Sequence, residues 1–170
     1  MTLLAVDLGL RTGLALYGKD GRLLWYRSHN FGTATRLRRG VQAILSDLPE
    51  LKWLVMEGGG NLALIWQKEA QRRGISVMQV AAETWRRQIL LPREQRNGPQ
   101  AKLHSGEIAR RAIEWSGAER PTSLRHDAAE AILIGLWGVL ELGWLKDMPA
   151  RVRCPPTASG CGAKKKVTQS

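Results

Sequence analysis

Cysteine is scarce in this chain of 170 residues, which contains only Cys154 and Cys161. Two cysteines cannot complete a four-ligand zinc site, and both lie near the C-terminus, so we assign them no structural role. Phenylalanine and tyrosine are also rare, with one and two residues, whereas tryptophan occurs seven times. Most tryptophans in the predicted helices fall on apolar faces, which predicts core packing for Trp66, Trp85, Trp115, Trp137 and Trp144.

Long apolar runs are absent from the sequence. The sequence contains no uninterrupted stretch of about 18 apolar residues, the length needed to span a bilayer. No basic segment precedes the first apolar run, as it would in a signal peptide. We therefore expect an intracellular protein with no membrane partner. The chain of 170 residues has room for one domain with a substantial core, and its hydrophobic content of 44% is typical of a globular protein.

Acidic residues are outnumbered, with 15 aspartates and glutamates against 26 lysines and arginines, so the net charge is +11. Such a basic excess favours a polyanionic partner, most often nucleic acid, although an anionic membrane surface or an incidentally basic surface would give the same composition. Residues 86–111 contain seven basic residues and only two acidic ones. We interpret this segment as a phosphate-binding rim, with a solvated helix face as the alternative reading.

Hydrophobic patterning predicts an α/β protein. Five strands are expected at residues 3–7, 13–17, 23–28, 52–57 and 75–80, and helices at residues 35–48, 61–73, 101–115 and 126–145. This order predicts a mixed five-stranded sheet flanked by helices, in which a right-handed crossover places the fourth strand beside the first. We assign residues 1–148 to the domain. Residues 149–170, rich in proline, glycine and lysine, are predicted to form a basic disordered tail.

Carboxylates stand at the ends of buried elements. Asp7 and Glu57 each follow an unbroken apolar run, and such runs are typical of strands covered on both faces. Asp127 and Glu130 are three residues apart at the start of an apolar helix, so they share one helix face. Several carboxylates around one point suit two-metal phosphodiester hydrolysis. The alternatives are a favourable helix-dipole interaction for the helical pair and a surface position for Glu57.

Three of these motifs together resemble the RuvC-type Holliday junction resolvases of the RNase H-like superfamily. The resemblance covers about residues 1–144 in element order, and it rests on Leu4-Ala5-Val6-Asp7-Leu8-Gly9, Val55-Met56-Glu57 and His126-Asp127-Ala128-Ala129-Glu130-Ala131. Two further pieces fit the family: Ala82-Glu83-Thr84-Trp85-Arg86 after the fifth strand, and Gln100-Ala101-Lys102 at a helix start.

The resemblance implies an RNase H-like fold and a homodimer that makes paired symmetric nicks in four-way DNA junctions. It implies two Mg²⁺ ions per site, replaceable by Mn²⁺, held by Asp7, Glu57, Asp127 and Glu130, with Lys102 near the scissile phosphate. The residues expected to contact DNA are Gly59, Gly60, Asn61, Arg86, Arg87, Arg93, Arg96 and Lys102.

The sequence departs from the family pattern in two places. Glu130 stands where aspartate is usual, and the loop at residues 58–62 lacks the aromatic residue that often inserts into the junction centre. The alternatives are an RNase H-like nuclease acting on RNA or other branched DNA, and a DNA-binding protein without catalysis. A sugar-kinase or actin-like ATPase would need a second domain that 170 residues cannot supply. No helicase partner is indicated by the sequence.

Overall fold

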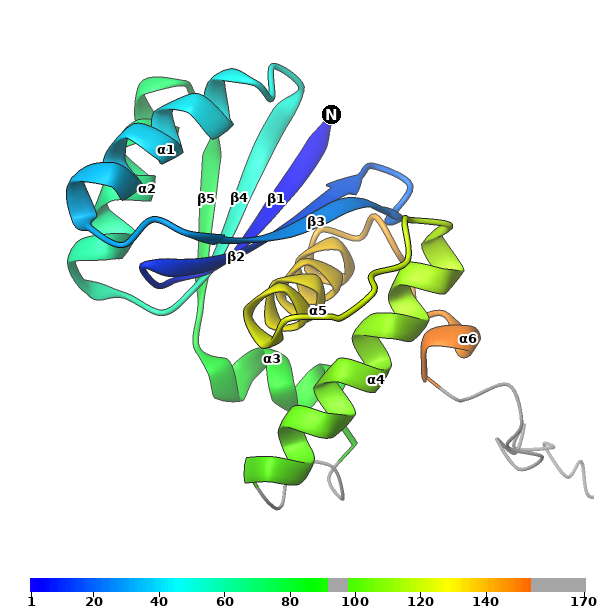
Figure 1. Ribbon diagram of the computed structural model, residues 1–170. Helices are drawn as coiled ribbons and strands as arrows, with labels where there is room; N and C mark the ends of the chain where they lie inside the picture. The colour runs from blue at the N-terminus through cyan, green and yellow to red at the C-terminus, as the bar shows by residue number, and fades with distance from the viewer. Residues whose placement is uncertain (92–97, 154–170) are drawn as a thin grey trace, which may run out of the picture.

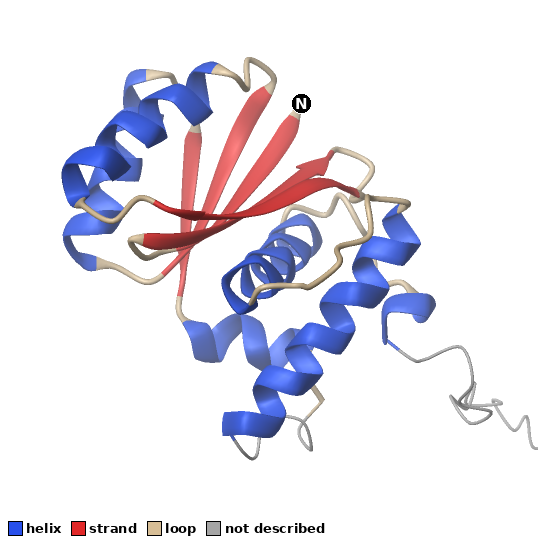
Figure 2. Cartoon of the chain, in the orientation of Figure 1, coloured by secondary structure: helices blue, strands red, loops and turns tan. Residues whose placement is uncertain are grey.

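The architecture is a single mixed sheet with helices on both faces (Figures 1 and 2). The computed structural model describes residues 1–91 and 98–153. The sheet order is β3-β2-β1-β4-β5, with β1 antiparallel to β2 and parallel to β4. The predicted mixed five-stranded sheet is thereby confirmed, and so is the pairing of the fourth strand with the first. The strands are β1 (Thr2–Asp7), β2 (Arg11–Gly18), β3 (Leu23–Asn30), β4 (Leu51–Glu57) and β5 (Ser76–Val80).

Alternating side chains divide the core into two layers. In β1, Leu4 and Val6 belong to the layer beneath the helix pair α1 and α2, whereas Leu3 and Ala5 belong to the layer beneath α5. The helices are α1 (Ala34–Ser46), α2 (Gly60–Arg72), α3 (Ala82–Ile89), α4 (Gly98–Ser116), α5 (His126–Glu141) and α6 (Ala150–Arg153). Residues of α3, α4 and α6 pack in the same layer as α5.

Helix α5 is the buried centre of its layer. Residues 128–139 are all buried, as expected for a helix that is apolar around its whole circumference. It lies very close to the sheet, because a Cβ added to Gly135 would fall 2.3 Å from Cε2 of Tyr17. The Tyr17 hydroxyl donates a hydrogen bond of 2.6 Å to the carbonyl of Ile132. The close packing fixes the start of α5 relative to β1 and β2.

The C-terminal boundaries differ from those predicted. Helix α5 ends at Glu141 rather than at residue 145, because the chain turns at Gly143, which has a φ of +68°. Helix α6 follows the predicted boundary at residue 148, and its Val152 is fully buried in the core. The packed chain therefore extends at least to Arg153. Residues 154–170, with both cysteines and the lysine run, lie outside the described residues.

Three of the predicted core tryptophans, Trp66, Trp85 and Trp137, are buried. In the part of the chain that the structure describes, no helix combines the length and apolarity needed to cross a membrane.

Candidate functional site

The first two candidate carboxylates are neighbours in the sheet. Asp7 at the end of β1 is in register with Glu57 at the end of β4. Side chains alternate along a strand, so Asp7 points to the same face as Ala5, and Glu57 to the same face as Val55. Ala5 and Val55 both belong to the core layer under α5. Both carboxylates are therefore presented toward α5.

Helix α5 brings the other two carboxylates to the same place. Gly13 of β2 is in register with Asp7, and a Cβ added to it would lie 1.9 Å from the carbonyl oxygen of Asp127. Only glycine permits this approach, so Gly13 lets the first turn of α5 rest on the sheet beside Asp7. Glu130 follows one turn later and is buried, with 4% of its surface exposed. We call Asp7, Glu57, Asp127 and Glu130 the acidic cluster.

The acidic cluster perturbs its own ionisation. The pKa of Asp7 is raised from 3.8 to about 7, chiefly by burial and then by the negative charges of Glu57, Glu130 and Asp127, while the charge of Arg86 lowers it. Burial also raises the pKa of Glu57, although a hydrogen bond from Trp85 and the charge of Arg86 oppose it. These mutual effects are the electrostatic sign that the carboxylates share one site, and they make that site attractive to cations.

Three of the four carboxylates are held by protein donors. Trp85 Nε1 donates to Glu57 Oε2, and Ser28 Oγ donates to Asp127 Oδ2. Arg86 Nη2 donates to Glu130 Oε2 over 2.7 Å. His126 lies farther off, with its Nε2 at 3.9 Å from Glu130 Oε1. The donors fix the carboxylate orientations and supply one positive charge from Arg86.

The chemistry of the cluster suits a divalent cation, because carboxylate oxygens are the hard ligands that Mg²⁺ prefers. Within residues 1–91 and 98–153, however, no three His, Cys, Asp or Glu side chains are gathered closely enough to hold a metal ion as they stand. Glu57, Asp127 and Glu130 are instead turned to their protein donors. The donor types and the shared negative charge fit a divalent cation, and gathering the ligands would require side-chain rotation.

The predicted DNA-contacting residues are found in several surroundings. Arg86 is turned inward to Glu130, whereas Arg87 on the same helix is exposed. Gly59, Gly60 and Asn61 are exposed at the start of α2. Lys102 is exposed on α4, and no described contact joins it to the acidic cluster. Arg93 and Arg96 lie outside the described residues.

Sequence reasoning missed Ser28 and the polar role of Trp85. Ser28 is in register with Gly13, which pairs with Asp7, which pairs with Glu57, so these residues form a single row across the sheet. Only the register of β3 with β2 places Ser28 beside the carboxylates, and this register cannot be predicted from the sequence pattern. Trp85 was predicted as a core residue and is fully buried, but its indole N–H also needs an acceptor, and Glu57 supplies it.

Comparison with solved structures identifies the fold. A Thermus thermophilus RuvC in complex with a Holliday junction substrate matches with a TM-score of 0.59 and 16% identity, covering 84% of this chain and 96% of that one. A second Thermus thermophilus RuvC structure matches with the same TM-score and coverage at 14% identity. The fold is that of RuvC. The predicted RNase H-like α/β class is thus confirmed, while no protein-family model and no curated protein matches the sequence.

Proposed function

We propose that this protein is a metal-dependent endonuclease that cuts four-way DNA junctions. The observation that carries the proposal is the convergence of the acidic cluster, in which Asp7 and Glu57 end adjacent parallel strands and Asp127 and Glu130 open the helix packed over them. The RuvC-like fold and the net charge of +11 support the choice of a nucleic-acid substrate.

Asp7, Glu57, Asp127 and Glu130 would hold Mg²⁺, with two ions per site and Mn²⁺ as a substitute. Bound there, the ions would stabilise the negative charge on the attacking and leaving oxygens of an in-line phosphodiester hydrolysis. Glu130 is one methylene longer than the aspartate that is usual at this position of the family pattern. Its side chain is buried on α5, and its carboxylate accepts a hydrogen bond from Arg86.

The surrounding side chains have positioning roles in this proposal. Trp85 orients Glu57, and Ser28 orients Asp127, because each donates to one carboxylate oxygen and leaves the other available. Arg86 stands beside Glu130 with 40% of its side chain exposed, so its guanidinium could turn to an incoming phosphate. Lys102 remains the predicted cation near the scissile phosphate.

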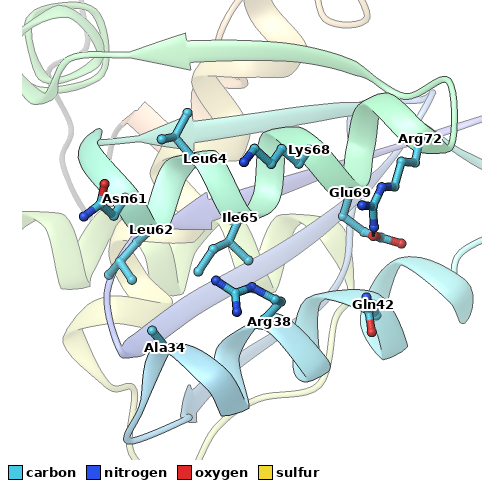
Figure 3. Close-up of a pocket in the computed structure, with 10 residues that line it drawn as sticks. All are labelled: Ala34, Arg38, Gln42, Asn61, Leu62, Leu64, Ile65, Lys68, Glu69 and Arg72. Atoms are coloured by element: carbon cyan, nitrogen blue, oxygen red, sulfur yellow. Dashed lines mark ion pairs between the residues drawn. The ribbon is translucent and has the colours of Figure 1, made fainter.

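A homodimer would match the twofold symmetry of two paired nicks. Helix α2 offers an apolar surface for it: Leu64 is 48% exposed, and a groove of about 560 Å³ runs between α1 and α2. Figure 3 shows Leu62 and Ile65 pointing toward α1, whereas Leu64 lies on the side of α2 away from α1. We propose that α2 and its apolar side chains pack against a second copy of the chain.

The proposal is tested with a labelled immobile four-way junction, incubated with Mg²⁺ and separately with chelator. Wild-type protein is expected to nick it only with Mg²⁺. Asp7→Asn keeps the shape of the side chain and removes one ligand charge, so we expect cleavage to fall at least about a hundredfold. Binding measured in chelator should stay within about twofold or tighten, because a negative charge near the phosphate is lost.

Asp47→Asn is the matched control, because Asp47 is exposed at the end of α1, on the opposite face of the sheet. This variant should cleave the junction like wild type. Cleavage by Asp7→Asn at the wild-type rate would overturn the metal-site assignment. Faster cleavage of a flap or of structured RNA than of the junction would instead favour the alternative nuclease function. Binding without cleavage under any metal condition would identify a non-catalytic DNA-binding protein.

A further inference from the structure

The connection between β4 and α2 begins with three consecutive glycines, residues 58–60, which we call the glycine loop. Gly58 and Gly60 have φ values of +104° and +74°, a region that residues with a side chain rarely adopt. Because glycine has the widest choice of backbone conformations, such a loop does not fix its own path. Glu57 of the acidic cluster directly precedes the loop, and the predicted DNA contacts at residues 59–61 lie in it or beside it. Its path therefore affects both the metal site and the approach of the strand.

One side chain of the edge strand β5 contacts the glycine loop. Gln79 Nε2 donates a hydrogen bond to the carbonyl of Gly58. A Cβ added to Gly59 would lie 3.3 Å from the same nitrogen, so the loop passes closely against the amide. Gln79 is in register with Met56 of β4, and both side chains point to the α2 face of the sheet, opposite the acidic cluster. Gln79 thus holds the loop from the outer side.

A second glutamine orients the first. Gln67 Nε2 on α2 donates a hydrogen bond of 3.1 Å to Gln79 Oε1. An amide group has its acceptor and its donor on opposite branches, so this bond directs the nitrogen of Gln79 toward the carbonyl of Gly58. The two hydrogen bonds join α2, β5 and the glycine loop, which are neighbours at one edge of the sheet (Figure 1).

The residue after Asp7 contacts the other side of the glycine loop. The Leu8 N–H donates a hydrogen bond of 3.4 Å to the carbonyl of Glu57. A Cβ added to Gly58 would lie 3.5 Å from the Cβ of Leu8, which is ordinary van der Waals contact. The loop therefore lies between Leu8 and Gln79. A shift of the loop away from Leu8 would move the backbone of Glu57 relative to Asp7.

We propose that Gln79 is a positioning residue for the cleavage reaction. Its amide holds the glycine loop, so that Glu57 and residues 59–61 keep a fixed position relative to Asp7. The inference rests on the proposed nuclease function. Gln79 acts through the loop, because its own side chain points to the opposite face of the sheet from the acidic cluster. A misplacement of about 1 Å can cost about a hundredfold in rate, so a loosened loop should slow the chemical step.

The test compares wild type with Gln79→Met, which keeps the length of the side chain and removes the amide. Cleavage of a four-way junction at saturating Mg²⁺ gives kcat and KM, and the nicks are mapped to single phosphates on a sequencing gel. We expect kcat to fall about tenfold while KM stays within about twofold, and the nicks to spread to neighbouring phosphates. Gln79 is exposed, so the melting temperature should stay close to that of wild type.

Gln79→Lys is the rescue variant, because its ammonium group can also donate to the carbonyl of Gly58. It should restore kcat and the single nick position. Val77→Ala is the matched control, since Val77 is 36% exposed on the same face of β5 and lines the same hollow of about 380 Å³. It should cleave like wild type. Gln67→Met should cause a smaller loss than Gln79→Met, and combining the two should add little to the loss from Gln79→Met alone.

Three outcomes would overturn the positioning role. The first is a wild-type kcat and nick position in Gln79→Met, or an equal loss in Val77→Ala. The second is a raised KM with an unchanged kcat, which would make Gln79 a substrate contact. The third is a loss that Gln79→Lys does not restore, which would mean that the hydrogen bond to Gly58 is not the cause.

The two proposals fail in different ways. A wild-type chain that cuts the junction while Gln79→Met cuts it equally well would overturn the positioning role alone. A wild-type chain that cuts no junction with any metal ion would overturn the nuclease function, and with it the role of Gln79 in cleavage. Amide hydrogen exchange in the free protein tests the hold on the loop separately, because residues 58–61 should exchange about tenfold faster in Gln79→Met. Unchanged exchange would show that Gln79 does not hold the loop.

Discussion

Arg86 and Glu130 form a hydrogen-bonded ion pair of 2.7 Å at the edge of the acidic cluster. The Glu130 side chain is only 5% exposed, so its charge is stabilised chiefly by protein groups. Partial burial lowers the pKa of Arg86, but the hydrogen bond and the charge of Glu130 outweigh this effect and raise it overall. Arg86 also lowers the pKa values of Asp7 and Glu57. It therefore acts as an internal cation for carboxylates that otherwise repel one another.

Replacing Arg86 should destabilise the metal-free protein and strengthen cation binding. Arg86→Gln leaves Glu130 without its charged partner, which should lower the free energy of unfolding by about 1–3 kcal/mol, less than for a fully buried pair because Arg86 is 40% exposed. The more negative cluster should bind Mg²⁺ several-fold more tightly. Urea unfolding and calorimetric Mg²⁺ titration measure the two effects.

Arg87→Gln is the matched control for this change, because Arg87 is exposed on the same helix and makes no described ion pair. It should alter neither stability nor Mg²⁺ affinity appreciably. Weaker Mg²⁺ binding by the Arg86 variant would contradict the internal-cation role and would indicate that Arg86 helps to build the site.

The ionisation of Asp7 should make the metal-free protein less stable as pH rises. Its pKa is 3.8 when unperturbed and about 7 in the fold, so the native state binds more protons than the unfolded chain between these values. The free energy of unfolding should therefore fall from about pH 4 to about pH 7, by at most about 4 kcal/mol from this group. Glu57 should act in the same direction, because its pKa is also raised.

Urea unfolding in chelator at pH 5 and pH 8 measures this dependence. Asp7→Asn cannot ionise at this position, so its stability should change less between the two pH values than that of wild type. Added Mg²⁺ should raise the stability of wild type more at pH 8, where the carboxylates are charged, than at pH 5. Identical pH dependence in wild type and Asp7→Asn would contradict the assigned pKa of Asp7.

The backbone positions of the acidic cluster followed from sequence because simple rules govern them. Apolar runs identify covered strands, and the crossover rule puts the fourth strand beside the first, so Asp7 and Glu57 were expected to be neighbours. Helical spacing put Asp127 and Glu130 on one face. Each of these inferences depends on local patterning and on one topological rule.

The partners of the carboxylates could not be predicted in the same way. Ser28 reaches Asp127 through the register of β3 with β2, and that register depends on long-range packing. Arg86 was predicted only as a DNA contact, but it also pairs with Glu130, because burying a carboxylate is costly unless a cation is hydrogen-bonded to it. Helix α6 has four residues, too few to leave a periodic signal, although Val152 is fully buried.

The proposed dimer makes Leu64 a sensitive position. Leu64 is 48% exposed on α2 in the single chain, so Leu64→Glu should leave the fold of the monomer intact. A charge buried in an apolar interface should weaken association by about 2 kcal/mol or more, which is roughly thirtyfold in the dissociation constant. Light scattering during gel filtration, over a range of protein concentrations, measures the change.

Leu103→Glu is the control for the dimer, since Leu103 is 60% exposed on α4. It should leave the dissociation constant unchanged. If the wild type is monomeric at concentrations where it cuts junctions, or if both variants dissociate equally, α2 is not the dimer surface.

Truncation should locate the end of the folded chain at α6. A chain ending at Arg153 keeps Val152, which is fully buried, and also the carbonyl that accepts a 2.7 Å hydrogen bond from Arg111 Nε. A chain ending at Pro149 loses both, and burial of a valine side chain alone is worth about 1.5–3 kcal/mol. We expect the shorter chain to lose about 2–4 kcal/mol of unfolding free energy, and the longer one to unfold like the full chain.

Removal of the three lysines at positions 164–166 should lower junction affinity in both truncations equally, because they lie beyond both ends. Equal stability of the two truncated chains would show that α6 adds nothing to the core, and would restore the boundary predicted at residue 148.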